Sequence, residues 1–439
     1  MKYSLALALA LLTQAQAATI AVVDSGVDYL HQQLAHKMWL NPIIEYKGEF
    51  PRAINGWNFI DKNNEIFDHS HIDSFPDDVF RYFEVEARYN AGTLTAEDRK
   101  FISERLTDEE FYAKISAYGG YAHGTHVAGI ATKNTDHEII GLKYIATSLS
   151  SILDHLRSSK SSKKMTAEET FHYYLAYIAQ AQGDNFAAVG RFLEKHVADV
   201  MNGSYGAAFK QIQRISDTVY REVYQKSPNA DESYKSAYIL QYFVLESYKK
   251  TLAKNKNTLF VFAAGNDSSN NDLYPASPAN LNVENSITVA ATHGTHSLAK
   301  FSNYGAKTVD VAAPGVNIYS AAPGTNNVPM SGTSQAAPFV SRVAGKIKDA
   351  NPRLTPAQIK QILMETVDKK SFLKNKVKSE GIVNEQRAVR AAELSRNLTL
   401  TRAIYQANVQ ISQSAKSFIP FRSPVEDLRF VELPSTFTE

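Results

Sequence analysis

The chain has 439 residues, of which 44% are apolar and 21% are charged, and its formal net charge is +2. This near-neutral balance gives no electrostatic reason to expect nucleic acid or an anionic membrane surface as a partner. The sequence contains no cysteine, which excludes disulfides, thiol catalysis and thiolate metal sites.

The N-terminal segment has the pattern of a secretory signal peptide. Lys2 precedes an apolar run from Leu5 to Leu12, and small residues follow at Ala15-Gln16-Ala17. We therefore predict a signal peptide over residues 1–17, cleavage before Ala18, and a secreted or periplasmic protein. The apolar run is about half as long as a bilayer-spanning helix, so we expect no membrane span.

Short apolar segments recur along the chain and predict strands. Those from residue 258 onward lead into Gly, Pro or Asn, and segments with helical periodicity lie between some of them, which favours an α/β fold with a mostly parallel sheet. The predicted strands are Thr19–Val23, Val197–Met201, Thr258–Ala263, Ser286–Ala291 and Thr308–Ala312. Thr166 and Thr355 are predicted to start helices, the second with Pro356 at the first helical position.

Three polar, Tyr-rich stretches read as helical insertions in this sheet-based core, since no Gly/Ser/Pro linker borders them. They cover residues 72–120, 143–196 and 208–255. The predicted organisation is therefore one domain over residues 18–399 that contains these insertions, followed by a C-terminal tail at 400–439.

Three motifs carry residues suited to nucleophilic catalysis. Asp24 ends a predicted strand in "VVDSGVD", and His123 opens "HGTHVAG", where we expect it to project from a helix N-terminus into a cleft. Ser334 lies in "MSGTSQAAP", after a turn at Gly332 and at the start of a helix. A serine nucleophile needs a histidine base, and the base needs a carboxylate to orient it. Taken alone, Ser334 could equally be an ordinary helix N-cap.

Three other histidines in similar surroundings are interpreted differently. His126 is predicted to be structural and packed beneath the turn. The second "HGTH", at residues 293–296, is predicted to be a surface turn because no apolar helix follows it.

Together these motifs resemble the subtilisin family of serine proteases, whose members carry Asp, His and Ser in this chain order. The resemblance implies a subtilisin-like three-layer fold and a serine endopeptidase that acts on protein or peptide substrates through an acyl-enzyme. In "FVFAAGN" it implies that Asn266 donates to the oxyanion. It also implies that a substrate pocket has its walls at Ser204, Tyr205 and Gly206 and at Ala264 and Gly265. Neither wall contains an acidic residue, which favours apolar substrate side chains.

The resemblance implies no cofactor for the chemistry, and we assign no metal ligand. A structural calcium ion remains compatible with an exported member of this family. The acidic stretch at 68–78 is better explained as a solvated loop than as a cation site.

Two alternative functions remain open at this point: a dedicated processing protease with a narrow substrate, and a catalytically silent binding protein with this fold. Exported members of the family usually carry an N-terminal pro-region, and Asp24 follows the predicted cleavage site so closely that we expect none here. We therefore expect residues 18–439 to refold unaided, helped by the insertions or the tail. The alternative is a folding partner or inhibitor in trans.

Overall fold

The computed structural model describes residues 17–438 except 106, 145–146, 159–164 and 414–436. The predicted signal peptide therefore lies almost wholly outside the described residues, as does most of the predicted tail beyond residue 413.

The centre of the molecule is a twisted sheet with the strand order β12-β13-β9-β7-β6-β5-β1-β3-β2, and β8 pairs with β7. Neighbouring strands are parallel except for the pairs β7–β8 and β12–β13. The prediction of an α/β fold with a mostly parallel sheet is thus confirmed. The strands are β1 (Thr19–Asp24), β2 (Gly56–Asn58), β3 (Glu138–Lys143), β5 (Val200–Gly203), β6 (Leu259–Ala263), β7 (Ser286–His293), β8 (Ser297–Leu298), β9 (Val311–Pro314), β12 (Asp368–Lys369) and β13 (Gly381–Ile382).

Two further pairs of strands lie outside this sheet. The antiparallel hairpin of β10 (Ile318–Ala321) and β11 (Asn327–Met330) precedes the Ser334 segment. Strand β4 (Thr147–Ser148) pairs in parallel with β14 (Phe437–Thr438).

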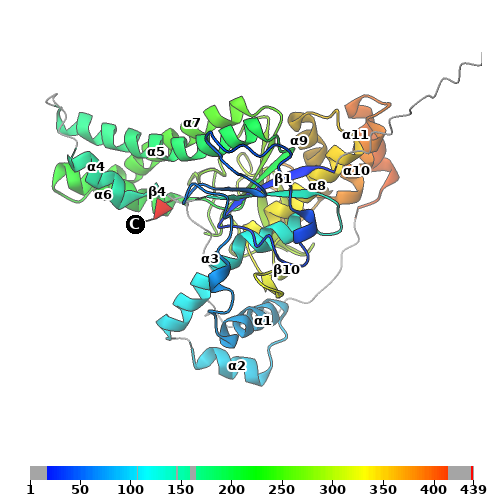
Figure 1. Ribbon diagram of the computed structural model, residues 1–439, viewed down its shortest axis with the longest axis horizontal. Coiled ribbons are helices and arrows are strands. Elements are labelled where there is room, and N and C mark those ends of the chain that lie inside the picture. The colour runs from blue at the N-terminus through cyan, green and yellow to red at the C-terminus, as the bar shows by residue number, and fades with distance from the viewer. Residues whose placement is uncertain (1–16, 106, 145–146, 159–164, 414–436, 439) are drawn as a thin grey trace, which may run out of the picture.

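Helices cover both faces of the sheet (Figure 1). The helices are α1 (Asp77–Ala91), α2 (Ala96–Ser103), α3 (Glu109–Ala131), α4 (Leu149–Ser158), α5 (Ala167–Lys195), α6 (Phe209–Tyr224), α7 (Ala230–Lys254), α8 (Thr333–Ala350), α9 (Pro356–Glu365), α10 (Glu385–Leu394) and α11 (Leu400–Gln410). Both predicted helix starts are confirmed, because Thr166 and Thr355 form capping boxes with Glu169 and Gln358.

The three layers follow from the alternation of side chains along each strand. Ile20 and Val22 of β1 belong to an apolar cluster with α8, α9, α10 and the C-terminal half of α3. Ala21 and Val23, which point the other way, pack in a cluster with α5, α6 and α7. Helices α5, α6 and α7 therefore form one layer of the core. That residues 143–196 and 208–255 are insertions with these boundaries stays a prediction.

The course of helix α3 differs from the expectation. The sequence predicts His123 at a helix N-terminus, but the residue lies well inside α3, which starts at Glu109 after the N-cap Asp108. The helix runs through because Phe111, Ile115 and Tyr118 continue its apolar face directly into the His123 segment, and Gly119-Gly120 does not interrupt it. Glycine inside a helix costs only about 1 kcal/mol relative to alanine, which tertiary packing can offset.

Helices α1 and α2 and the first half of α3 form a lobe that projects from one side of the sheet (Figure 1). Its core includes Val79, Phe83 and Phe101 and continues onto Val328 and Met330 of the β10–β11 hairpin. The lobe is therefore joined to the region of Ser334 by packing and to His123 by one continuous helix.

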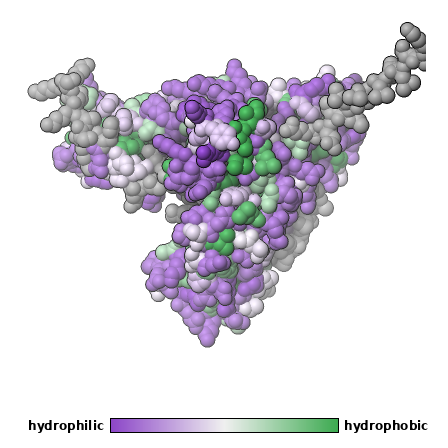
Figure 2. Space-filling model, in the orientation of Figure 1, coloured by the Kyte–Doolittle hydropathy of each residue, from purple (hydrophilic) through white to green (hydrophobic). Residues whose placement is uncertain are grey.

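The visible surface is mostly hydrophilic, with a hydrophobic patch on the face in view (Figure 2). Large exposed apolar side chains in the segment before β2 include Leu40, Ile43 and Ile44. Among the residues that the structure describes, no helix combines the length and the hydropathy needed to cross a membrane.

Candidate active site

Asp24 and His123 meet at the carboxyl end of the parallel sheet. Asp24 is the last residue of β1 and is 3% exposed, and its Oδ1 accepts a hydrogen bond from Nδ1 of His123 at 2.7 Å. The same oxygen accepts from the backbone N–H of Ser25 at 2.8 Å. Because an ionised carboxylate can only accept, Nδ1 carries the proton and Nε2 of neutral His123 is left as an acceptor.

Gly124 allows this approach of α3 to the turn after β1. A Cβ atom at this position would lie 2.1 Å from the carbonyl oxygen of Gly26 and 3.0 Å from Cβ of Asp24. No side chain fits there without moving the helix, so the distance between His123 and Asp24 depends on a glycine at 124.

Ser334 occupies the second position of α8 and is 2% exposed. Its hydroxyl donates to the carbonyl oxygen of Ser204 at 3.2 Å, and the Ser204 hydroxyl donates to the carbonyl oxygen of Ser334 at 3.0 Å. Within the described part of the chain, no hydrogen bond joins Ser334 Oγ to His123. The structure thus pairs His123 with Asp24 directly and attaches Ser334 to the wall segment at 204–206.

Asn266 lies beside the start of α8 with its amide held in one orientation. Its Oδ1 accepts from both the N–H and the hydroxyl of Thr333, each at 2.9 Å. The Nδ2 group has no acceptor among the described residues, so its two donors are available near the N-terminus of α8. Thr333 also accepts from the N–H of Gly265 at 3.1 Å.

Asn303 organises the loop that follows β6, a role that the sequence analysis did not assign. Its Oδ1 accepts from the N–H groups of Asp267 and Ser269, at 2.8 and 3.0 Å. Gly265 adopts a φ of +113°, and a Cβ there would lie 2.3 Å from Asn303 Nδ2. The only sequence features that pointed to this contact between Gly265 and Asn303 were the glycine itself and the "FSNYG" segment at 301–305.

The predicted pocket walls contribute mainly backbone. Ser204, Tyr205 and Ala264 are buried, and only Gly206 of the first wall is partly exposed. The Tyr205 side chain is 3% exposed and stacks on Tyr144, with ring centroids 5.3 Å apart. Burial raises the pKa of Tyr205 well above its usual value. The Tyr205 ring therefore packs into the core. That the backbone of the two wall segments binds substrate stays a prediction.

His126 is buried, as predicted, and its ring hydrogen-bonds the carbonyl oxygen of Val328 at 3.0 Å. Burial lowers its pKa to about 3, so it is neutral at physiological pH. Gln335, which follows Ser334, is 2% exposed and contacts His126 at 3.5 Å.

The acidic stretch at 68–78 contributes His69, whose Nε2 lies 3.0 Å from Oδ1 of buried Asp28. Among the described residues, no group of three or more His, Asp or Glu side chains is arranged to hold a metal ion. Binding of a structural calcium ion stays a prediction.

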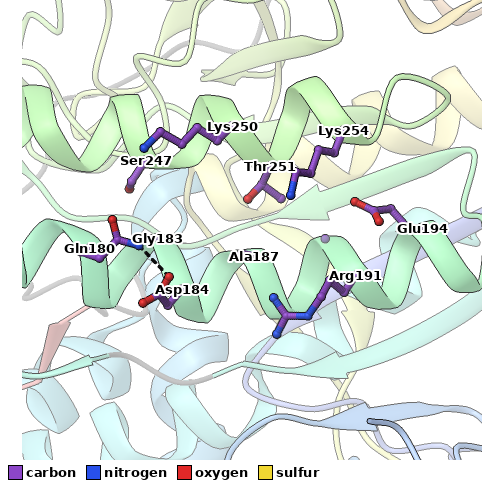
Figure 3. A pocket seen from close by; sticks show the side chains of 11 residues that line it. Gln180, Gly183, Asp184, Ala187, Arg191, Glu194, Ser247, Lys250, Thr251 and Lys254 are labelled. Carbon is purple, nitrogen blue, oxygen red and sulfur yellow. Dashed lines mark hydrogen bonds between the residues drawn. The ribbon is translucent and has the colours of Figure 1, made fainter. Parts of the chain in front are cut away.

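A cavity of about 170 Å³ between α5 and α7 lies outside this constellation (Figure 3). Lys250 and Lys254 line it from α7, and Asp184 and Arg191 from α5. None of its lining residues is a predicted site residue, and its mixed charges favour no ligand class.

Comparison with known proteins identifies the family. The model of the subtilase family matches residues 15–388. The chain therefore belongs to the subtilase family, and the resemblance stated from its motifs is confirmed.

Among curated proteins, the cell wall-associated protease of Bacillus subtilis (strain 168) is 40% identical over 116 residues, which cover 26% of this chain and 12% of that protein. Subtilisin BL of Lederbergia lenta is 36% identical over 138 residues, or 31% of this chain and 48% of the relative. The chain thus spans less than half the length of each. A solved structure of a cold adapted subtilisin-like serine proteinase is 20% identical, with a TM-score of 0.42, and the match covers 83% of this chain and 86% of that one.

Proposed function

We propose that the protein is an exported serine endopeptidase that uses Asp24, His123 and Ser334. The observation that carries the proposal is the buried 2.7 Å hydrogen bond from His123 to Asp24 at the carboxyl edge of the sheet. It fixes the tautomer in which Nε2 can accept a proton. Family membership and the N-terminal apolar run support the peptidase class and the export, respectively.

The first chemical step requires the Ser334 hydroxyl to leave the Ser204 carbonyl and turn toward His123. We expect this change to be a rotation about the Cα–Cβ bond of Ser334, which exchanges one acceptor of the hydroxyl for another. His123 Nε2 then takes the proton as Ser334 Oγ attacks the peptide carbonyl, and Asp24 stabilises the imidazolium that forms. The protonated imidazole gives its proton to the leaving amine, and water releases the acyl group in a second, equivalent step.

The negative charge that develops on the carbonyl oxygen needs donors that are already in place. Asn266 Nδ2 and the N–H of Ser334 are suited to this role, because Thr333 holds the Asn266 oxygen side and leaves its donors unused. A preorganised donor of this kind stabilises the transition state without reorganisation during the reaction.

A serine-directed fluorophosphonate tests the assignment of the nucleophile. Wild-type protein should be labelled, and Ser334→Ala should lose the label. Ser341→Ala is the matched control, since Ser341 is a buried serine on the same helix that bonds Asn202 and should leave labelling intact. Labelling that persists in Ser334→Ala would exclude Ser334 as the nucleophile, and an unlabelled wild type would favour a silent binding protein.

Digestion of unfolded casein beside a panel of folded proteins separates the two kinds of protease. A broad degradative enzyme would cleave casein at many sites. A dedicated processing protease would leave casein largely intact and cleave few members of the panel.

A further inference from the structure

Strand β4 follows directly on the segment that leaves the proposed catalytic edge of the sheet. Tyr144, three residues before β4, donates its N–H to the carbonyl oxygen of Asp24 at 2.9 Å. Three residues of extended chain reach at most about 11 Å, so Thr147 is within that distance of Tyr144. The Tyr144 ring stacks on Tyr205, whose neighbour Ser204 accepts the hydrogen bond of Ser334. Strand β4 therefore begins within about 11 Å of a residue that hydrogen-bonds Asp24 and stacks on Tyr205.

Strand β4 is not part of the central sheet. Among the described strands, its only ladder is with β14, in which Phe437 pairs with Thr147 and Thr438 with Ser148. Figure 1 draws the red strand β14 beside β4, far along the chain from its partner. An exposed strand edge is the type of surface that binds an extended peptide through backbone hydrogen bonds.

We infer that residues Phe437–Thr438 are an internal strand that occupies a peptide-docking edge at β4 and competes there with extended polypeptide substrates. The docking follows from the β4–β14 ladder, whereas its effect on substrates rests on the proposed peptidase function. Because the occupant belongs to the same chain, its effective concentration at β4 does not depend on protein concentration. The strand should lower the activity toward long substrates and leave the chemistry at Ser334 unchanged.

Cross-linking tests the docking independently of activity. The chain has no cysteine, so Thr147→Cys combined with Phe437→Cys places the only two thiols at paired positions of the ladder. Paired strands are about 4.8 Å apart, which is within the range of Cα separations that a disulfide bridges. Mild oxidation should give an intramolecular disulfide in the full-length protein, detected by a linked peptide in mass spectrometry.

The control for this experiment combines Thr147→Cys with Thr401→Cys on helix α11, which forms no ladder with β4 among the described residues. It should stay reduced under the same conditions. If the Phe437 pair forms no more disulfide than the control, the inference is wrong.

Kinetics with two substrates test the competition. In the full-length chain, the double substitution F437P/T438P removes two backbone donors and restricts the strand, whereas F437A/T438A keeps the backbone intact. For a peptide anilide of four or more residues, kcat/KM should rise about tenfold in the proline variant, since one or two backbone hydrogen bonds are lost. The alanine variant should remain closer to wild type. A single-residue ester, too short to reach β4, should be hydrolysed equally by all three proteins.

Each outcome has a separate meaning. Equal kcat/KM for the long substrate in all three proteins would overturn the competition. If no protein hydrolyses either substrate or reacts with the fluorophosphonate, the proposed function fails, and the cross-link alone then decides whether β14 docks.

Discussion

The backbone N–H of Ala18 donates to Oδ1 of Asp349 at 2.7 Å, which joins the start of β1 to the end of helix α8. The other oxygen of Asp349 lies 3.0 Å from Nε2 of buried His137. Ala18 is itself buried, with 1% exposure. Cleavage before Ala18, as the sequence predicts, would convert this nitrogen into an ammonium group already placed against a carboxylate.

We expect a chain that starts at Ala18 to be more stable than the same chain with its α-amino group acetylated. The gain should be about 1 kcal/mol, because a partly exposed charged pair contributes little more than a neutral hydrogen bond. Denaturant unfolding of the two proteins measures it. In Asp349→Asn the difference should vanish, and a difference of the same size in that variant would exclude the ion pair as its cause.

Gly124→Ala should lower kcat/KM by at least about 100-fold. The added Cβ would collide with the Gly26 carbonyl and press on Asp24, so α3 would have to move away from the turn and take His123 with it. Gly120→Ala in the same helix is the control, since a Cβ atom added at Gly120 would have no heavy atom within 4 Å beyond its chain neighbours and the backbone of its own helix. That variant should keep its activity and gain up to about 1 kcal/mol of stability. Equal activity in both variants would show that close approach at Gly124 is not required.

Thr333 should act as a positioning residue through Asn266. Thr333→Val removes the hydroxyl that donates to Asn266 Oδ1, so we expect kcat to fall about tenfold with little change in KM. Asn266→Ala should cost more, since loss of one oxyanion donor in subtilisin costs about 100- to 1000-fold in kcat. The double variant should be no worse than Asn266→Ala, and additive losses would mean that Thr333 acts independently. Thr333→Ser keeps the hydroxyl and should preserve kcat.

Glu86 should make the stability of the lobe depend on pH. Burial raises its pKa from 4.5 to about 8, so between these values the folded state holds a proton that the unfolded state has released. Stability should therefore fall as pH rises from about 4.5 to 8 and stay level above it. Glu86→Gln should match wild type at pH 4 and exceed it at pH 9 by up to about 5 kcal/mol. Urea unfolding at the two pH values measures this difference.

The matched control for Glu86 is Glu110→Gln, whose carboxylate is 81% exposed and pairs with Lys114. It should leave the pH dependence of unfolding as in wild type. A pH-independent difference between Glu86→Gln and wild type would contradict ionisation of Glu86 as the cause.

Local patterns in the sequence were sufficient to predict five strands of the central sheet and two helix starts, whereas β2 and β3 were not predicted. The apolar run before Asp24 indicated β1. Thr166 and Thr355 indicated helix starts because each is followed three residues later by a Glu or Gln that completes a capping box. The continuous course of α3 was not predicted. Whether Gly119-Gly120 ends a helix depends on how Phe111, Ile115 and Tyr118 pack against α1 and the β10–β11 hairpin.

The sequence by itself determined the family, the fold class and the candidate residues Asp24, His123, Ser334 and Asn266, because each is carried by a short motif or a local period. The tertiary structure decided how these residues meet. It turns the Tyr205 ring into the core, pairs Ser334 with Ser204, and brings Ala18 to Asp349 and Thr147 to Phe437. Most of these contacts join positions more than a hundred residues apart. They are determined by the packing of whole layers, which the conformational preferences of a short segment do not specify.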